Sequence, residues 1–152
     1  MNIGETLNCR KFLLFKRAGR ETGMSFRAVI VDDDRVTLTI LEKALSEAGF
    51  EVEIAPDGMK ALSIIQTQCP GVVIMDLLLP KLHGLELCAR IRRNALLSNV
   101  TVILMSEVYD YSTFRQEIDG SEADYFITKP LNIPELIGFL RRILVDKKLE
   151  TV

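Results

Sequence analysis

Short runs of apolar residues recur along the chain, and each run stops at a polar or turn-forming residue. The runs cover residues 26–31, 52–55, 72–76, 101–105 and 125–128, and Asp76 closes the third of them. A continuous apolar run of this length, bounded by turn residues, is typical of a buried strand. The pattern therefore predicts five strands.

Between these strands, apolar residues recur at the three- to four-residue spacing of an amphipathic helix. The predicted helices begin at Val36, Gly58, Leu85, Tyr109 and Asn132. Gly49 suits the end of the first helix, and Asn132 with Glu135 resembles a capping box at the start of the last. The predicted inward positions are Val36, Ile40, Leu41, Ala44, Leu45 and Ala48, then Ala61, Leu62 and Ile65, then Leu85, Cys88 and Ile91, then Phe114 and Ile118, and finally Leu136, Ile137, Leu140, Ile143 and Leu144.

Five strands that alternate with five amphipathic helices indicate an α/β fold with a parallel sheet covered on both faces. Right-handed crossovers leave few arrangements of such a sheet. A closed eight-stranded barrel needs a much longer chain than 152 residues. The sequence therefore predicts an open, doubly wound sheet in a single domain.

The net charge of the chain argues against nucleic acid as a partner, and its uneven distribution separates a basic start from the rest of the chain. A net charge of −2 predicts no strong binding to nucleic acid, and no apolar run approaches the length of a membrane helix. Three cysteines without metal-type spacing favour the reducing cytoplasm. Residues 1–24 carry a net charge of +3, which predicts a flexible basic extension over residues 1–25.

Polar residues stand where four of the predicted strands end. Asp32 and Asp33 follow the first strand, Asp76 closes the third, Ser106 follows the fourth and Lys129 follows the fifth. Because the carboxyl ends of parallel strands share one edge of the sheet, these five side chains are expected to converge there. Clustered carboxylates repel one another and need a cation, and oxygen ligands favour Mg²⁺. A carboxylate beside Mg²⁺, a hydroxyl group and a lysine is placed to receive a phosphoryl group.

From about Phe26 to Asp146, the chain resembles a receiver domain of the response regulators of two-component signalling. The resemblance rests on Val31-Asp32-Asp33-Asp34, Met75-Asp76-Leu77 with Pro80 and Gly84, Ser106 after an apolar strand, and Lys129-Pro130. It implies a flavodoxin-like (βα)5 fold with strand order 2-1-3-4-5. The receiver domain would then span residues 26–147, with a short tail over 148–152.

The resemblance also implies a role for each residue at the sheet edge. Asp76 would be the phosphoacceptor, and Lys129, often joined to Pro130 by a cis peptide bond in this family, would contact the phosphoryl group. Asp33 would bind Mg²⁺ directly and Asp32 largely through water, while Asp76 and the backbone carbonyl of Leu78 would complete the metal ligands.

A switch is implied as well. Ser106 would contact the phosphoryl group and form a switch pair with Phe126, and together they would remodel the face made by the fourth helix, fifth strand and fifth helix. Glu107 departs from the small residue usual at its position, and would either slow phosphorylation by repulsion or point into solvent. Leu78 and Val108 occupy the two positions that commonly tune dephosphorylation in the family that the chain resembles. Because both are apolar and orient no water, the phosphorylated form is expected to be long-lived.

The implied phosphoryl donor is a phosphohistidine on a sensor histidine kinase or a histidine phosphotransfer protein. Little sequence follows the last predicted helix, so we expect a stand-alone regulator that acts through contact with a target protein. Neither nucleic acid nor stable membrane insertion is expected, and a phosphorylation-dependent dimer stays open.

Two other functions remain open at this point. Asp32-Asp33-Asp34-Arg35-Val36 fits the nucleophile motif of haloacid-dehalogenase-type phosphatases, with Asp32 as nucleophile. Such enzymes need a later acidic pair, for which the chain offers only scattered acids, and they leave Asp76 without a role. A receiver-like scaffold that works without phosphorylation is the other alternative. His83 is predicted to be a solvated loop residue, and Arg92 and Arg93 a solvated helix face, with contact to an acidic partner as the alternative for the two arginines.

Overall fold

The computed structural model describes residues 26–150, except the side chains of Val108, Tyr109, Lys148 and Glu150. The expected extension over residues 1–25 lies outside this range. Five strands form one parallel sheet in the order β2-β1-β3-β4-β5. They are β1 (Arg27–Val31), β2 (Glu51–Ala55), β3 (Val72–Asp76), β4 (Thr101–Glu107) and β5 (Tyr125–Lys129). The predicted fold class and strand order are confirmed.

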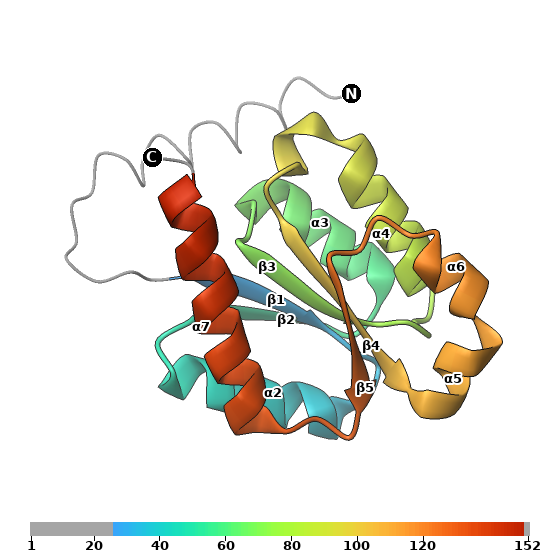
Figure 1. The fold of residues 1–152 in the computed structure, drawn as a ribbon, viewed down its shortest axis with the longest axis horizontal. Coiled ribbons are helices and arrows are strands. Elements are labelled where there is room, and N and C mark those ends of the chain that lie inside the picture. The colour runs from blue at the N-terminus through green and yellow to red at the C-terminus, as the bar shows by residue number, and fades with distance from the viewer. Residues whose placement is uncertain (1–25, 151–152) are drawn as a thin grey trace.

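Helices cover both faces of this sheet (Figure 1). On one face lie α2 (Arg35–Glu47) and α7 (Ile133–Glu150), and on the other lie α3 (Gly58–Gln68) and α4 (Gly84–Arg93). The short helices η1 (Ala95–Leu97), α5 (Val108–Thr113) and α6 (Arg115–Asp119) complete the described elements. Among residues 26–150, no helix is both long and apolar enough to span a membrane.

The alternation of side chains along β1 divides the core into two layers. Ala28 and Ile30 pack with α2 and α7, whereas Val29 and Val31 pack with α3 and α4. All four side chains have no exposed area. Successive residues of a strand point to opposite faces, so a strand covered on both sides must be apolar throughout. This explains the unbroken apolar runs of the sequence.

The predicted inward face of the first helix is partly wrong. Val36 and Ile40 are 64% and 51% exposed, whereas Leu38, Leu41 and Leu45 face the core. Positions 38, 41 and 45 follow the three- to four-residue spacing of one helical stripe, and Val36 and Ile40 lie beside that stripe. Two large apolar side chains therefore remain in solvent on α2.

The fourth strand and the following helix also differ from expectation. β4 continues two residues past Met105, because Ser106 and Glu107 pair in register with Thr128 and Lys129 of β5. The helix predicted over residues 109–119 is two short helices, separated at Phe114, whose backbone (φ −108°, ψ 18°) is not helical. Ser106 is thus fixed by the sheet and does not lie in a loop.

Arg92 is not the solvated helix residue that the sequence predicts. Its guanidinium group donates to the carbonyls of Glu122 and Val100, at 2.8 Å each, and to Oδ2 of Asp124 at 2.6 Å. The same Oδ2 accepts the backbone N–H of Val102. Arg92 therefore ties the end of α4 to the starts of β4 and β5.

We expect Arg92→Ala to lower the free energy of unfolding by about 1–3 kcal/mol, because it removes three hydrogen bonds that join α4 to the starts of β4 and β5, and the packing of a side chain that is only 13% exposed. Arg93→Ala is the matched control, since the Arg93 side chain is 72% exposed and its ion pair with Glu86 is 3.8 Å long. That variant should change stability by less than about 0.5 kcal/mol. Urea denaturation measures both; equal losses would contradict the structural role of Arg92.

Candidate functional site

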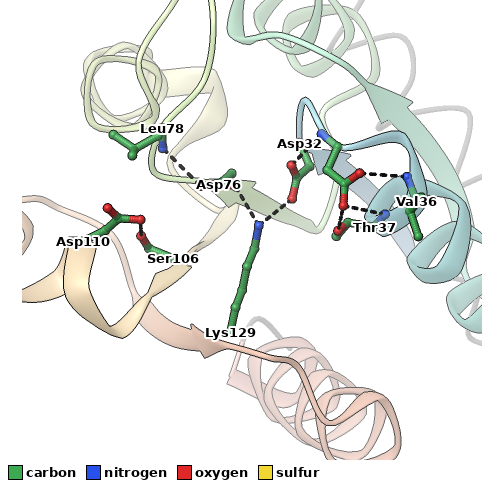
Figure 2. Close-up of polar contacts among 9 residues, drawn as sticks. Asp32, Val36, Thr37, Asp76, Leu78, Ser106, Asp110 and Lys129 are labelled. Atoms are coloured by element: carbon green, nitrogen blue, oxygen red, sulfur yellow. Dashed lines mark hydrogen bonds and ion pairs between the residues drawn. The ribbon is translucent and has the colours of Figure 1, made fainter.

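Three charged side chains meet at the carboxyl edge of the central strands. Lys129 Nζ lies 2.9 Å from Oδ2 of Asp32 and 2.7 Å from Oδ2 of Asp76. Figure 2 shows the lysine reaching from β5 to a point between the two carboxylates. One oxygen each from Asp32, Asp33 and Asp76 lies within 4.8 Å of the others. The predicted convergence of strand ends therefore brings these four residues together.

The end of β1 holds Asp32 inside the protein. Its side chain has no exposed area, and Oδ1 accepts the backbone N–H of Asp34 at 2.9 Å. Asp34 turns away from the site and caps α2, accepting the N–H groups of Val36 and Thr37 and the Thr37 hydroxyl. The three consecutive acids thus divide: two line the site and one starts the helix. This cap was missed in the sequence, although Asp before an amphipathic run is a usual helix-start signal.

Asp76 is fixed by the loop that follows β3. Its Oδ1 accepts the N–H of Leu78 at 3.1 Å, and Gly84 N–H donates to the carbonyl of Leu77 at 3.0 Å. A Cβ atom at position 84 would lie 2.5 Å from the backbone oxygen of Asp76. Only glycine permits this close approach, so Gly84 sets the path of the loop beside the Asp76 carboxylate.

Burial and the neighbouring charges shift the pKa values of Asp76 and Lys129. The pKa of Asp76 is raised, chiefly because burial penalises the charged form and also because the Asp32 carboxylate lies nearby, although Lys129 opposes both effects. Burial lowers the pKa of Lys129, but hydrogen bonds to Asp76 and Asp32 outweigh it and the net pKa is raised. The lysine is thus a firmly charged ammonium group, while Asp76 is ionised at a cost that an additional cation would relieve.

Ser106 reaches the same edge but contacts another partner. Its buried hydroxyl lies 3.1 Å from Oδ2 of Asp110, which is also buried, in the first turn of α5. The Phe126 ring is half-buried and lies 4.8 Å from the ring of Tyr111. Asp110 and Tyr111 were missed in the sequence, because a short helix with mixed composition gives no periodic signal.

The remaining predicted residues lie around the rim. Leu78 is 39% exposed and Glu107 is exposed at the end of β4, while the side chain of Val108 lies outside the described residues. The peptide bond between Lys129 and Pro130 is cis, as expected. His83 is not a freely solvated loop residue: it caps α4, with Nδ1 accepting the N–H of Leu85 at 3.3 Å.

The geometry agrees with comparisons to known proteins. A family model described as the response regulator receiver domain matches residues 28–141. Response regulator MprA of Mycobacterium ulcerans (strain Agy99) is 33% identical over 127 residues, which cover 84% of this chain and 53% of MprA. The chain thus spans about half the length of the curated relatives that it matches.

Solved structures give the same fold. The chemotaxis response regulator CheY4 of Vibrio cholerae has a TM-score of 0.72 at 26% identity, covering 79% of this chain and 99% of CheY4. The receiver domain of the sensor histidine kinase PA1611 from Pseudomonas aeruginosa, solved with magnesium in its active site cleft, has a TM-score of 0.73 at 24% identity. The match covers 79% of this chain and 98% of that one.

Proposed function

The chain belongs to the response regulator receiver domains, the phosphorylation-dependent switches of two-component signalling, and we propose that Asp76 is its phosphoacceptor. The observation that carries the proposal is the position of this carboxylate, which ends the central strand β3 with Lys129 Nζ at 2.7 Å and Asp32 beside it. The Asp76 side chain is 13% exposed, so a donor can reach it, whereas the side chain of Asp32 has no exposed area. Asp32 has no exposed area, which disfavours a phosphatase with Asp32 as nucleophile.

The proposed reaction is a transfer from a phosphohistidine. A carboxylate oxygen of Asp76 forms a bond to phosphorus while the phosphorus–nitrogen bond breaks, and the electron pair leaves with the imidazole of the donor. Lys129 Nζ, which holds two carboxylates, would turn toward an oxygen of the incoming phosphoryl group and offset its charge. Response regulators take their phosphoryl groups from histidine kinases; the particular kinase for this chain is part of the proposal.

Receiver domains bind Mg²⁺ in this site, and the residues present here fit the ion. Asp32, Asp33 and Asp76 offer hard oxygen ligands within 4.8 Å of one another, with the backbone carbonyl of Leu78 as a further ligand. When bound, Mg²⁺ would neutralise charge on the transferring oxygens. The chain's own residues supply the acceptor oxygen, the ammonium group and the hydroxyl of Ser106.

The test is to locate the phosphoryl group. Purified protein is incubated with Mg²⁺ and a small acyl phosphate, and the labelled peptide is identified by mass spectrometry after reduction of the acyl phosphate. We expect one modified residue, Asp76, and no label when a chelator removes Mg²⁺. Label on Asp32 would overturn the proposal in favour of the phosphatase, and no label at all would favour the phosphorylation-independent scaffold.

We expect the phosphorylated protein to lose its phosphoryl group over minutes or longer, because the exposed Leu78 side chain orients no water beside Asp76. The sequence gives the same reason at position 108, because the apolar residue Val108 also has no group to orient a water molecule. Leu78→Asn, which places an amide at the rim, should shorten the lifetime severalfold, and Leu78→Met is the apolar control. Phosphate release after removal of the donor measures the three lifetimes; decay of the wild type within seconds would contradict the expectation.

Exposed apolar side chains follow the strand ends that form the site and suit a protein donor. Among the described residues, four of the six exposed large hydrophobic side chains follow the carboxyl ends of strands; they are Val36, Ile40, Met59 and Leu78. Val36 lies in the first turn of α2, directly after the acidic residues, and Ile40 lies one helical turn further on. An apolar rim around a charged centre is typical of a protein interaction site.

We expect Ile40→Asp to reduce phosphoryl transfer from a histidine kinase or phosphotransfer protein about tenfold or more, because it places a charge in this apolar contact. Its labelling by a small acyl phosphate should stay unchanged. Leu149→Asp is the control, since Leu149 is 71% exposed near the end of α7, far from the start of that helix beside the site. Equal losses with the protein donor and the acyl phosphate would contradict a docking role.

A further inference from the structure

The hydroxyl of Ser106 is engaged by a carboxylate that the proposed reaction does not use. Ser106 Oγ donates to Oδ2 of Asp110 over 3.1 Å, and the two residues are only 1% and 6% exposed. Figure 2 shows this pair set apart from Asp76 and Lys129. A hydrogen bond to an ionised acceptor is about twice as strong as one between neutral groups, and burial strengthens it further. This hydrogen bond therefore holds α5 against the end of β4.

We propose that Asp110 is a positioning residue that holds the Ser106 hydroxyl away from the phosphoryl group and so opposes the phosphorylated state. The inference rests on the proposed function, in which Ser106 donates to the phosphoryl group. A hydroxyl group carries a single hydrogen, so Ser106 cannot donate fully to Asp110 and to a phosphoryl oxygen at once. The hydrogen bond from Ser106 to Asp110 must therefore break before Ser106 can donate to a phosphoryl oxygen on Asp76.

Loss of the hydrogen bond between Ser106 and Asp110 would also affect Phe126, the aromatic partner of Ser106 in the switch. A buried carboxylate without its donor is costly, so α5 must move its first turn toward water when Ser106 leaves. The helix is only six residues long, and Glu107 at its N-cap makes no side-chain capping bond. Tyr111, which directly follows Asp110, contacts Phe126 with ring centroids 4.8 Å apart and the rings tilted by 41°. A shift of Asp110 would therefore carry Tyr111 away from Phe126, which links the hydroxyl to the ring through α5.

Beryllium fluoride with Mg²⁺ tests the proposal, because it forms a stable mimic of an acyl phosphate on a carboxylate. Its affinity is measured by calorimetry for the wild type, Asp110→Asn, Ser106→Ala and the double variant. We expect Asp110→Asn to bind about five- to tenfold more tightly, the difference between a charged and a neutral acceptor. In the Ser106→Ala background, the same substitution should change affinity less than twofold, because no hydroxyl remains to be released.

Controls separate this positioning role from plain electrostatics. Removal of any negative charge near the site would favour an anion, but that gain would persist without Ser106. Glu107→Gln removes an exposed charge next to Ser106 in the chain and measures the size of that general effect. Asp110→Ala is a second variant should the amide disturb α5, and it should bind at least as tightly as Asp110→Asn. Thermal unfolding verifies that each variant is folded.

Each outcome bears on the inference. A gain for Asp110→Asn that requires Ser106 supports it. An equal gain in both backgrounds, or no gain for either Asp110 variant, overturns the positioning role and leaves the proposed function standing, provided that Asp76→Asn abolishes binding. Failure of the wild type to bind beryllium fluoride overturns the proposed function and the inference together.

Discussion

Asp76→Asn is expected to take up no phosphoryl group, from a small acyl phosphate or from a protein donor. The amide oxygen carries no charge and is a poor nucleophile, so the bond to phosphorus does not form. Asp32→Asn keeps the acceptor and should be labelled more slowly but on the same residue. Incorporation of labelled phosphate measures both variants. Label that survives in Asp76→Asn at the level of the wild type would disprove the role of Asp76.

The same substitution should stabilise the metal-free protein at neutral pH. The pKa of Asp76 is raised in the folded state, mainly by burial, so ionisation of this group costs folding free energy. The cost is absent in acid and appears as pH rises from the ordinary carboxyl value of 3.8 through the higher pKa of the folded state. Urea denaturation with a chelator present should therefore show a gain for Asp76→Asn at pH 7 that vanishes in acid. A loss at pH 7 would mean that Lys129 stabilises the ionised carboxylate outright.

Lys129→Met should slow phosphorylation by about a hundred- to a thousandfold, the usual effect of removing one group that stabilises charge in a transition state. It should also destabilise the fold by about 3 kcal/mol, since it leaves the buried Asp32 without its ion pair. Labelling rates and urea denaturation measure the two effects.

Lys81→Met is the matched control for this prediction. The Lys81 side chain is 68% exposed, and its ion pair with Asp57 is 3.4 Å long. Asp57 keeps its hydrogen bond from the backbone N–H of Lys60, so loss of the exposed lysine should cost less than about 1 kcal/mol and leave the rate of labelling unchanged. If Lys129→Met were labelled as fast as the wild type, the ammonium group would have no part in the transfer.

The strand ends could be predicted from the sequence because topology alone brings them together. Continuous apolar runs fix a parallel sheet, and a parallel sheet places Asp32, Asp76 and Lys129 on one edge whatever their side chains do. The prediction that these residues meet required no knowledge of which aspartate has which role, or of the hydrogen bonds that each one makes. This is why residues separated by 97 positions, such as Asp32 and Lys129, were expected to meet and do so.

Features that depend on side-chain direction were harder to predict. Hydropathy assigns Ile40 to the core, but Leu38, Leu41 and Leu45 already form the buried stripe of α2, and Ile40 lies outside it. Arg92 is charged and yet reaches three acceptors, because its long side chain bends along α4 to the strand starts. The bond between Ser106 and Asp110 joins a strand to a short helix, and no periodic pattern marks such a junction.

The ammonium group of Lys129 has a consequence for the dependence of this protein on metal. By standing between Asp32 and Asp76, it provides an internal counter-ion, so the described fold does not require a bound cation to keep the two carboxylates together. We therefore expect chelation to stop signalling without unfolding the chain, unlike in proteins whose metal holds the structure together. Mg²⁺ would then act as a cofactor of phosphoryl transfer alone, and changes in its free concentration would alter how fast the switch responds, not how much folded protein is present.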